Sequence, residues 1–173
     1  MILNVTINGE ARTFTIAPND TLLTVLRREG YLGVKHGCDD GTCGVCVVLL
    51  DGRAVLSCVL LAAQVARKNL TTIEGLGTRE ALHPLQAAFV ESGAVQCGFC
   101  TPAQILAAQA LLDEKGYGQA DGVPETIGED EVREALSGVL CRCTGYAKPV
   151  QAVMLAAERI RERAKGEGQD AVQ

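Results

Sequence analysis

The chain has 173 residues, which is enough for one or two small domains. Hydrophobic residues make up 47% of it, but aromatic residues make up only 3% and there is no Trp, so we expect cores built from Ala, Leu and Val. The formal net charge of −5 predicts an acidic surface, which argues against binding to nucleic acid.

The N-terminal residues enter an alternating apolar pattern at once, without a basic segment, a long apolar stretch or a signal cleavage site. No segment approaches about eighteen uninterrupted apolar residues, so we expect no membrane span. The chain is therefore expected in the cytoplasm, where thiols stay reduced. In that compartment eight cysteines indicate metal sites, and four disulfides are the alternative.

Two hairpins are predicted in the first part of the chain. Apolar and polar residues alternate from Leu3 to Ile7, and Asn8-Gly9 then provides a strong turn signal. The second hairpin is expected over residues 47–58, with its turn at Asp51-Gly52. A short strand near residues 70–73 would complete a small mixed sheet.

One helix is expected between the two hairpins. Leu22, Val25 and Leu26 recur at helical spacing, residues 18–20 form a polar cluster suited to capping, and Gly30 stands where the helix would end. A loop that carries three cysteines then runs from residue 33 to residue 46. This order predicts a sheet wrapped on one helix.

After residue 77 the apolar period becomes helical. Helices are predicted over residues 82–90, from Thr101 onward, over residues 129–136 and over residues 149–164. The second of them is expected to begin with a capping box that Thr101 opens and Gln104 closes. The glycine-rich loop 115–127 is expected to be exposed, and the charged end of the chain to be frayed. The sequence thus predicts a small β-rich domain followed by an all-helical one, joined near residues 74–80.

Four cysteines of the first half follow the pattern Cys38-x4-Cys43-x2-Cys46, with Cys58 after eleven more residues. The C-x4-C-x2-C opening is a signature of [2Fe–2S] ligation. Because a cluster held by four thiolates is negatively charged, burying it requires N–H donors aimed at sulfur. The glycines of this loop let the backbone curl and bring N–H groups close to the sulfurs. This set predicts one [2Fe–2S] centre and an electron-transfer function.

The other four cysteines form two short pairs, Cys97-x2-Cys100 and Cys141-x-Cys143. The first pair precedes a predicted helix N-terminus, where free N–H groups and the helix dipole favour thiolate over thiol. The second pair follows the helix stop predicted at Gly138. We expect two helix-end turns that face each other across one cluster. Taken alone, this spacing also suits a structural zinc ion.

Three strings of the sequence closely resemble the small iron–sulfur subunit of the molybdenum hydroxylases, the xanthine dehydrogenase and carbon monoxide dehydrogenase family. They are residues 33–46 (GVKHGCDDGTCGVC), 95–102 (VQCGFCTP) and 140–146 (LCRCTGY). The resemblance implies an α+β fold: an N-terminal, plant-ferredoxin-like β-grasp domain over residues 1–76, an all-α four-helix-bundle domain over residues 77–165, and a charged tail over residues 166–173. It also implies two [2Fe–2S] clusters, one held by Cys38, Cys43, Cys46 and Cys58, the other by Cys97, Cys100, Cys141 and Cys143.

The same resemblance implies an electron-transfer subunit of a larger oxidoreductase complex. In the family, the helical-domain cluster lies next to the molybdopterin cofactor of a large catalytic subunit, and the ferredoxin-type cluster passes electrons to FAD in a medium subunit. Gln96 and Cys143 match family residues at the pterin contact. We therefore expect a heterotrimer or a dimer of heterotrimers. No residue of this chain is expected to be catalytic toward substrate, because the substrate pocket is expected in another polypeptide.

The chain departs from the family strings in three places. Ala103 and Val139 stand where Gly and Asn are usual, and the loop 115–127 is longer than usual. Neither of the two residues is a predicted ligand. We expect them to affect local packing or cluster potential rather than the presence of the clusters.

Other chemically capable residues are given ordinary roles. His36 and His83 stand outside any Cys-x-His pairing of the Rieske kind, so surface or packing roles are expected. Asp39-Asp40 is expected to be a solvated loop, and Gly75-Leu76-Gly77 a linker rather than a dinucleotide-binding motif. Arg142 stands between two predicted ligands, where it either offsets cluster charge, holds the partner subunit or forms a plain surface salt bridge.

Two other functions are compatible with eight cysteines in this spacing. The first is a free-standing two-cluster ferredoxin, which would have no need of the pterin contact. The second is a structural module with two zinc ions, which would be colourless and free of iron.

Overall fold

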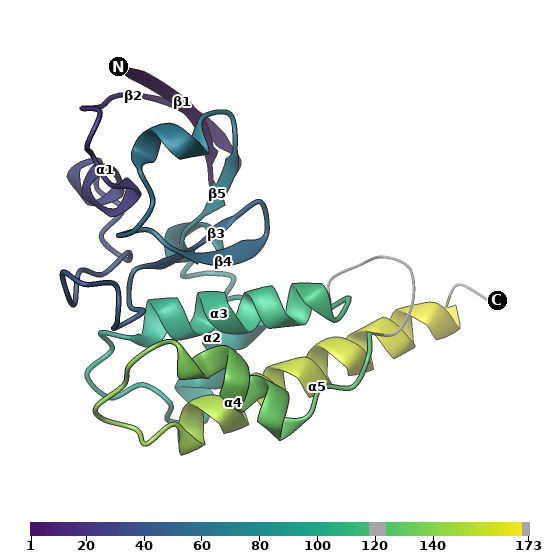
Figure 1. Ribbon diagram of the computed structural model, residues 1–173. Helices are drawn as coiled ribbons and strands as arrows, with labels where there is room; N and C mark the ends of the chain where they lie inside the picture. The colour runs from purple at the N-terminus through teal and green to yellow at the C-terminus, as the bar shows by residue number, and fades with distance from the viewer. Residues whose placement is uncertain (118–123, 171–173) are drawn as a thin grey trace.

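The computed structural model describes residues 1–117 and 124–170. A five-stranded sheet with one helix forms the first domain, and four helices form the second (Figure 1). The helix α3 (Thr101–Glu114) lies between the sheet and the other helices of its domain. The predicted α+β fold with two domains is confirmed.

The first domain is a mixed sheet with α1 on one face. Its elements are β1 (Ile2–Ile7), β2 (Glu10–Thr15), α1 (Leu22–Arg28), β3 (Val47–Leu50), β4 (Arg53–Leu56), β5 (Asn69–Thr71) and the short 3₁₀ helices η1 (Ala62–Val65) and η2 (Ile73–Gly75). The strand order is β2-β1-β5-β3-β4, with β1 and β5 parallel and the other neighbours antiparallel. The last strand ends at Thr71, earlier than predicted, because η2 begins at Ile73.

Both predicted hairpin turns are present. Asn8 and Gly9 have φ values of 53° and 82°, and Asp51 and Gly52 have values of 48° and 82°. Two consecutive residues with positive φ are what a two-residue hairpin turn of type I′ requires. The local sequence therefore decided these turns.

The cap of α1 differs from the prediction. It is Thr21, whose Oγ1 accepts the N–H of Thr24 at 3.1 Å, and not the polar cluster before it. Asp20, in that cluster, accepts the N–H of Ala17 at 2.9 Å and a bond from Arg28 at 3.2 Å. These contacts lower the pKa of the Asp20 carboxyl. The aspartate therefore stabilises the turn before the helix and not the helix end.

The strand β3 is buried on both faces. Val48 packs in the core between the sheet and α1, whereas Val47 and Leu49 belong to the core of the helical domain. Alternate side chains of a strand point to opposite faces, so this one strand contributes to two cores. The two domains therefore share an apolar interface that fixes one against the other.

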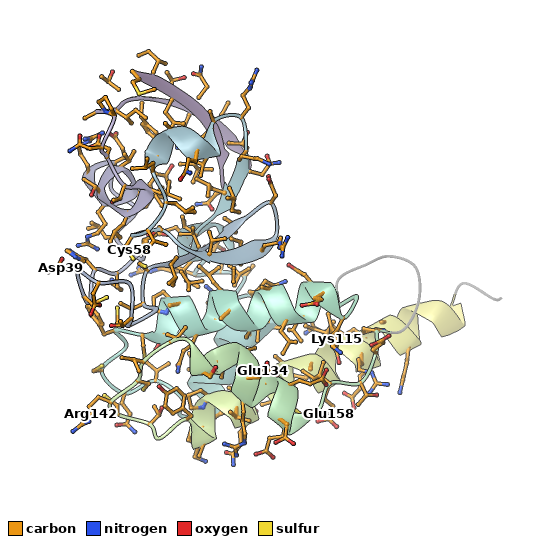
Figure 2. The ribbon with its side chains drawn as sticks, viewed as in Figure 1. Asp39, Cys58, Lys115, Glu134, Arg142 and Glu158 are labelled. Carbon is orange, nitrogen blue, oxygen red and sulfur yellow. The ribbon has the colours of Figure 1, made fainter. Side chains whose placement is uncertain are left out.

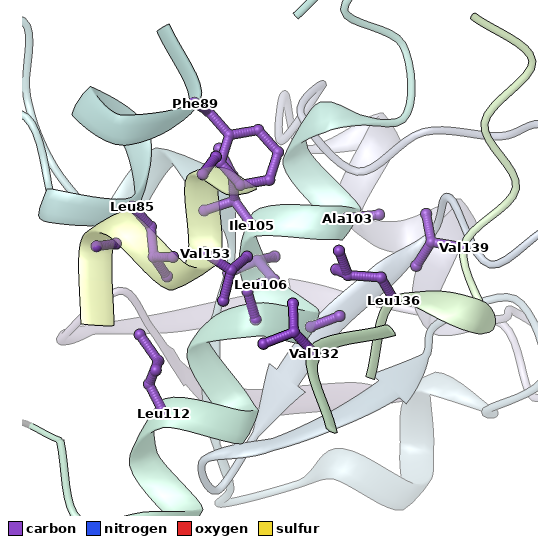
Figure 3. Packing of buried hydrophobic residues seen from close by; sticks show 14 of the residues in the cluster. Leu85, Phe89, Ala103, Ile105, Leu106, Leu112, Val132, Leu136, Val139 and Val153 are labelled. Atoms are coloured by element: carbon purple, nitrogen blue, oxygen red, sulfur yellow. The ribbon is translucent and has the colours of Figure 1, made fainter. Parts of the chain in front are cut away.

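The second domain is a bundle of four helices. They are α2 (Pro84–Glu91), α3, α4 (Glu129–Ser137) and α5 (Ala147–Asp170). Their core is mostly aliphatic, with Phe89 as its largest fully buried side chain, packed near Leu85 and Ile105 (Figure 3). α5 is longer than predicted, so helical backbone covers residues 166–170 of the expected tail. Within the described ranges, no helix is long and apolar enough to cross a membrane.

The capping box predicted for α3 is wrong. The cap is Cys100, and no side chain of the described residues caps this helix end with a hydrogen bond. Gln104 is fully buried, and neither polar atom of its amide has a hydrogen-bond partner among the described residues. Tertiary burial of the first turn, which also encloses Ala103, outweighs the local capping preference.

The described ends of the loop 115–127 are packed in part: Glu125 and Thr126 are exposed, as expected, but other residues are not. Tyr117, Pro124 and Ile127 are buried, and Lys115 forms an ion pair with Glu131 at 2.6 Å. The expectation of an exposed loop is therefore wrong for these residues. Its middle, residues 118–123, lies outside the described residues.

Candidate metal centres

The structure brings the four cysteines of the first set together. Cys38, Cys43 and Cys46 lie between α1 and β3, and Cys58 follows β4. The buried hydroxyl of Ser57 donates to the Cys46 carbonyl at 2.7 Å, and the Ser57 N–H donates to the same oxygen at 3.3 Å. These two bonds hold Cys58 beside Cys46. Ser57 was not predicted, and its place directly before a predicted ligand is its signal in the sequence.

The thiols of the first set interact in pairs, Cys38 with Cys43 and Cys46 with Cys58. Hydrogen bonds from the Cys43 thiol and from the backbone N–H groups of Cys43 and Asp40 lower the pKa of Cys38. Burial raises the pKa of Cys43. Burial and the neighbouring Cys46 raise the pKa of Cys58 to about 12. The predicted set of N–H donors to these sulfurs stays a prediction.

Glycines give the first cysteine loop its shape. Gly41 and Gly44 have φ values of 79° and 71°, in the left-handed region that favours glycine. A Cβ on Gly37 would lie 2.7 Å from Cγ2 of Val45 and 3.2 Å from Sγ of Cys43. A side chain at Gly37 would therefore press on a sulfur that is a predicted ligand.

The second set is built from two helix ends, as predicted. Cys97 and Cys100 precede α3, and Cys141 and Cys143 follow α4. Cys100 is buried and Cys141 half-buried, whereas Cys97 and Cys143 are exposed. The thiol of Cys100 interacts with that of Cys141, and the thiol of Cys97 with that of Cys143. Burial raises the pKa of Cys100 to about 12.

Thr144 and Tyr146 hold the turn that carries Cys141. Thr144 Oγ1 lies 3.1 Å from Cys141 Sγ. The Tyr146 hydroxyl donates to the Val139 carbonyl at 3.1 Å and accepts the N–H of Cys141 at 2.9 Å. Burial by itself would raise the pKa of Cys141, but bonds from the Thr144 hydroxyl and from the backbone of Thr144 and Cys143 outweigh it and lower that pKa. Neither Thr144 nor Tyr146 was assigned a role from the sequence, although both stand in the LCRCTGY string.

The donor set fits two-iron cores. All eight cysteines are free thiols, so the four disulfides of the alternative interpretation are not formed. Across residues 1–117 and 124–170, no group of three or more His, Cys, Asp or Glu side chains is placed to hold one metal ion. The thiols approach one another in pairs instead. Pairs suit a [2Fe–2S] core, in which each of the two irons takes two thiolates.

The remaining candidates lie at the surface or at a helix end. Gln96 and Arg142 are exposed, and Figure 2 shows Arg142 at the edge of the molecule. Nε2 of His36 lies 2.8 Å from Oδ1 of Asp39 in an exposed pair, as expected of a solvated loop. His83 caps α2 through Nδ1, which accepts a backbone N–H of the first turn at 3.3 Å. Burial lowers the pKa of the His83 imidazole.

Known families match both domains. The family described as "2Fe-2S iron-sulfur cluster binding domain" matches residues 5–71, and the "[2Fe-2S] binding domain" family matches residues 72–154. The chain is 44% identical to the nicotinate dehydrogenase small FeS subunit of Eubacterium barkeri, over 91% of this chain and 95% of that protein. It is also 44% identical to the xanthine dehydrogenase iron-sulfur-binding subunit of Escherichia coli O157:H7, over 86% of this chain and 89% of that protein.

Solved structures show the same fold. The chain aligns with quinoline 2-oxidoreductase from Pseudomonas putida 86 at a TM-score of 0.83 and 39% identity, over 94% of this chain and 96% of that one. It aligns with the aldehyde oxidoreductase of Desulfovibrio desulfuricans ATCC 27774 at a TM-score of 0.84 and 42% identity, over 93% of this chain but only 17% of that longer one. A free-standing ferredoxin and a zinc module are not favoured by these relatives. The chain belongs to the family of small iron–sulfur subunits of the molybdenum hydroxylases, oxidoreductases in which it is the electron-transfer subunit beside a large catalytic partner.

Proposed function

We propose that each set of four cysteines holds one [2Fe–2S] cluster. The first cluster is held by Cys38, Cys43, Cys46 and Cys58 in a domain over residues 1–76, and the second by Cys97, Cys100, Cys141 and Cys143 in a domain over residues 77–165. The observation that carries this assignment is that each matched [2Fe–2S] family covers one set of cysteines, with the first four inside residues 5–71 and the other four inside residues 72–154. When bound, such a cluster accepts and releases one electron at a time.

The chain's own contribution is to position and tune these centres. Backbone N–H groups at Cys38 and Cys141 and the Thr144 hydroxyl oppose the negative charge on sulfur. Burial of Cys43 and Cys100 acts in the opposite sense, because it disfavours charge. Effects of these kinds move cluster potentials within a range of about −700 to +450 mV.

Electrons enter through the second set in this proposal. Cys97 and Cys143 are exposed, and the apolar side chains of Val95, Phe99 and Leu140 near them are 40–58% exposed. An exposed apolar patch around a redox centre suits contact with another subunit. We place Gln96 and Cys143 at the molybdopterin cofactor of the large subunit.

Electrons leave through the first set toward FAD in a medium subunit. Val59 is 63% exposed and stands beside the first cysteine loop, since a Cβ on Gly41 would lie 3.0 Å from its Cγ1. Leu32 and Leu61, at 55% and 44%, are exposed in the same domain. These side chains support a second subunit contact and therefore a heterotrimer or a dimer of heterotrimers. Eight free thiols suit the reducing conditions of the cytoplasm, where we place the complex.

The test is metal analysis and electron paramagnetic resonance on the native complex purified without oxygen. We expect iron, molybdenum and flavin, and two distinct paramagnetic centres after reduction. Cys43→Ser is expected to perturb one centre and Cys100→Ser the other. An iron-free wild-type complex, or loss of both centres from either substitution, would contradict two independent clusters.

A further inference from the structure

The two cysteine loops touch through their backbones. The N–H of Leu140, directly before Cys141 of the second set, donates to the carbonyl of Cys43 of the first set at 2.8 Å. The two residues belong to different domains. This hydrogen bond therefore connects the residues that carry one predicted ligand from each centre.

The contact requires a glycine at position 44. A Cβ on Gly44 would lie 1.8 Å from the carbonyl oxygen of Gly138 and 3.0 Å from Cα of Val139. The obstructing atoms are backbone, so a rotamer change cannot relieve the clash. The φ of 71° at Gly44 also favours glycine. Any side chain here would push the first cysteine loop off the second.

Each side of the contact is anchored in its own domain. The carbonyl of Gly44 accepts the first N–H of β3 at 3.3 Å, and the N–H of Val139 donates to Leu136 of α4 at 3.1 Å. The Phe99 ring adds a second point of contact, because a Cβ on Gly37 would lie 3.4 Å from its Cε1. The loops therefore form a fixed junction.

We propose that Gly44 is a positioning residue that sets the electronic coupling between the two iron–sulfur centres. The inference rests on the function proposed above. By lacking a Cβ, Gly44 lets the Cys43 carbonyl reach the N–H of Leu140. The bonded route from the Cys43 sulfur to the Cys141 sulfur then needs a single hydrogen bond.

Electron tunnelling decays less steeply through bonds than through empty space, so breaking this junction slows transfer between the centres. The step itself is balanced: one centre loses the electron that the other gains, and no further reactant is needed. Gly44 touches neither sulfur in this role. It acts only through the spacing of the two loops.

The experiment uses the complete complex carrying Gly44→Ala. Two glycines provide matched controls, because a Cβ on either meets no atom of the described residues within 4 Å: Gly138→Ala, on the other side of the contact at a φ of −75°, and Gly52→Ala, in the turn between β3 and β4 at a φ of 82°. The readouts are the magnetic interaction between the two reduced centres and the rate of electron transfer between them after rapid partial reduction. We expect a weaker interaction and several-fold slower transfer in Gly44→Ala. Iron content, g values and midpoint potentials should stay as in the wild type, and both controls should match it.

Three results would overturn the proposal. The first is an iron-replete Gly44→Ala complex with unchanged interaction and rate. The second is loss or spectral change of one centre, which would show that Gly44 builds that centre. The third is a wild-type complex whose two reduced centres show no magnetic interaction, a measurement that holds even where the variant fails to fold. Leu140→Pro removes the donor, and its ring carbon takes the place of the hydrogen that points at the Cys43 carbonyl, so it opens the junction from the other side and should also weaken the coupling. An iron-free wild type would instead refute the proposed function itself.

Discussion

The two cysteine sets differ in how far water reaches them. In the first set Cys43 and Cys46 are buried and the other two thiols are half-buried, because a loop and a hairpin of one domain close around them. In the second set two turns at helix ends meet, which leaves Cys97 and Cys143 exposed while Cys100 is buried. The second set is therefore open to solvent on one side, whereas the first is largely enclosed by its own domain.

Iron removal from the separated subunit should show the largest contrast between the two sets. We expect a chelator under mild oxidation to bleach the second centre first, because its exposed thiols admit the reagent. Following each paramagnetic signal with time measures the difference. In the complete complex the second centre should be protected from the chelator, so the difference between the rates of iron loss from the two centres should become smaller. If both centres of the separated subunit lost iron at the same rate, the exposed thiols of the second set would not be the reason for its reactivity.

Leu49→Ala tests whether the shared interface holds the two sets together. Leu49 is 4% exposed, on the face of β3 that packs on the helical domain, and such truncations cost about 2–5 kcal/mol. We expect a lower free energy of unfolding by denaturant, followed by circular dichroism. Val90→Ala is the control, because Val90 is 68% exposed and should cost about 0.5 kcal/mol or less. A Leu49→Ala variant as stable as this control would show that the domains do not depend on the interface.

Gln104→Met should stabilise the helical domain. The buried amide of Gln104 lacks a hydrogen-bond partner among the described residues, which costs about 1–3 kcal/mol, and Met is apolar and of similar shape. The expected result is a gain of about 1 kcal/mol in the unfolding free energy of the cluster-free chain. A loss of stability would reveal that the amide has a bound partner.

Thr144→Val should shift one potential and not the other. The Thr144 hydroxyl bonds to Cys141 Sγ and favours the more negative, reduced state, so its removal should lower the potential of the second centre. A hydrogen bond worth about 0.5–1.5 kcal/mol corresponds to about 20–60 mV for one electron. A redox titration that follows the paramagnetic signal of each centre measures the two midpoint potentials. Ser137→Ala, which loses an exposed hydroxyl bonded to the Glu134 carbonyl at 2.7 Å, is the control and should leave both potentials in place. A shift of the first centre in Thr144→Val would argue against a local effect.

The smallest expected effect is a pH dependence that belongs to the helical domain. Arg159 on α5 forms two hydrogen bonds of 2.8 Å with Glu91 on α2, and they lower the pKa of the Glu91 carboxyl from 4.5. A lowered pKa contributes stability above the ordinary value, and this is lost as the pH falls through the folded-state value. Unfolding curves of the wild type and Glu91→Gln should therefore differ slightly at neutral pH and converge in acid. If the difference in unfolding free energy between the two proteins grew as the pH fell, the proposed contribution of Glu91 would be contradicted.

Local signals in the sequence predicted much of the fold. The turns at Asn8-Gly9 and Asp51-Gly52 follow from residues that accept positive φ, and the spacing of the cysteines predicted two sets that the structure brings together. These features depend on a few neighbouring residues. They can therefore be read without knowledge of the tertiary structure.

The errors and omissions come from contacts between distant segments. Gln104 matched a capping box, but burial took its side chain away from the helix end. Ser57 and Tyr146 act by bonding backbone groups that only the folded chain brings near. The reason for a glycine at position 44 is the backbone of Gly138. No window of neighbouring residues contains that information.

The two-faced strand β3 also constrains the order of events during synthesis. When the first domain leaves the ribosome, Val47 and Leu49 have no cover, because α3 is translated later. An exposed apolar strand face is prone to aggregation until α3 has been synthesised and packs on it. We therefore expect a truncation before residue 101 to yield protein that is less soluble than the complete chain.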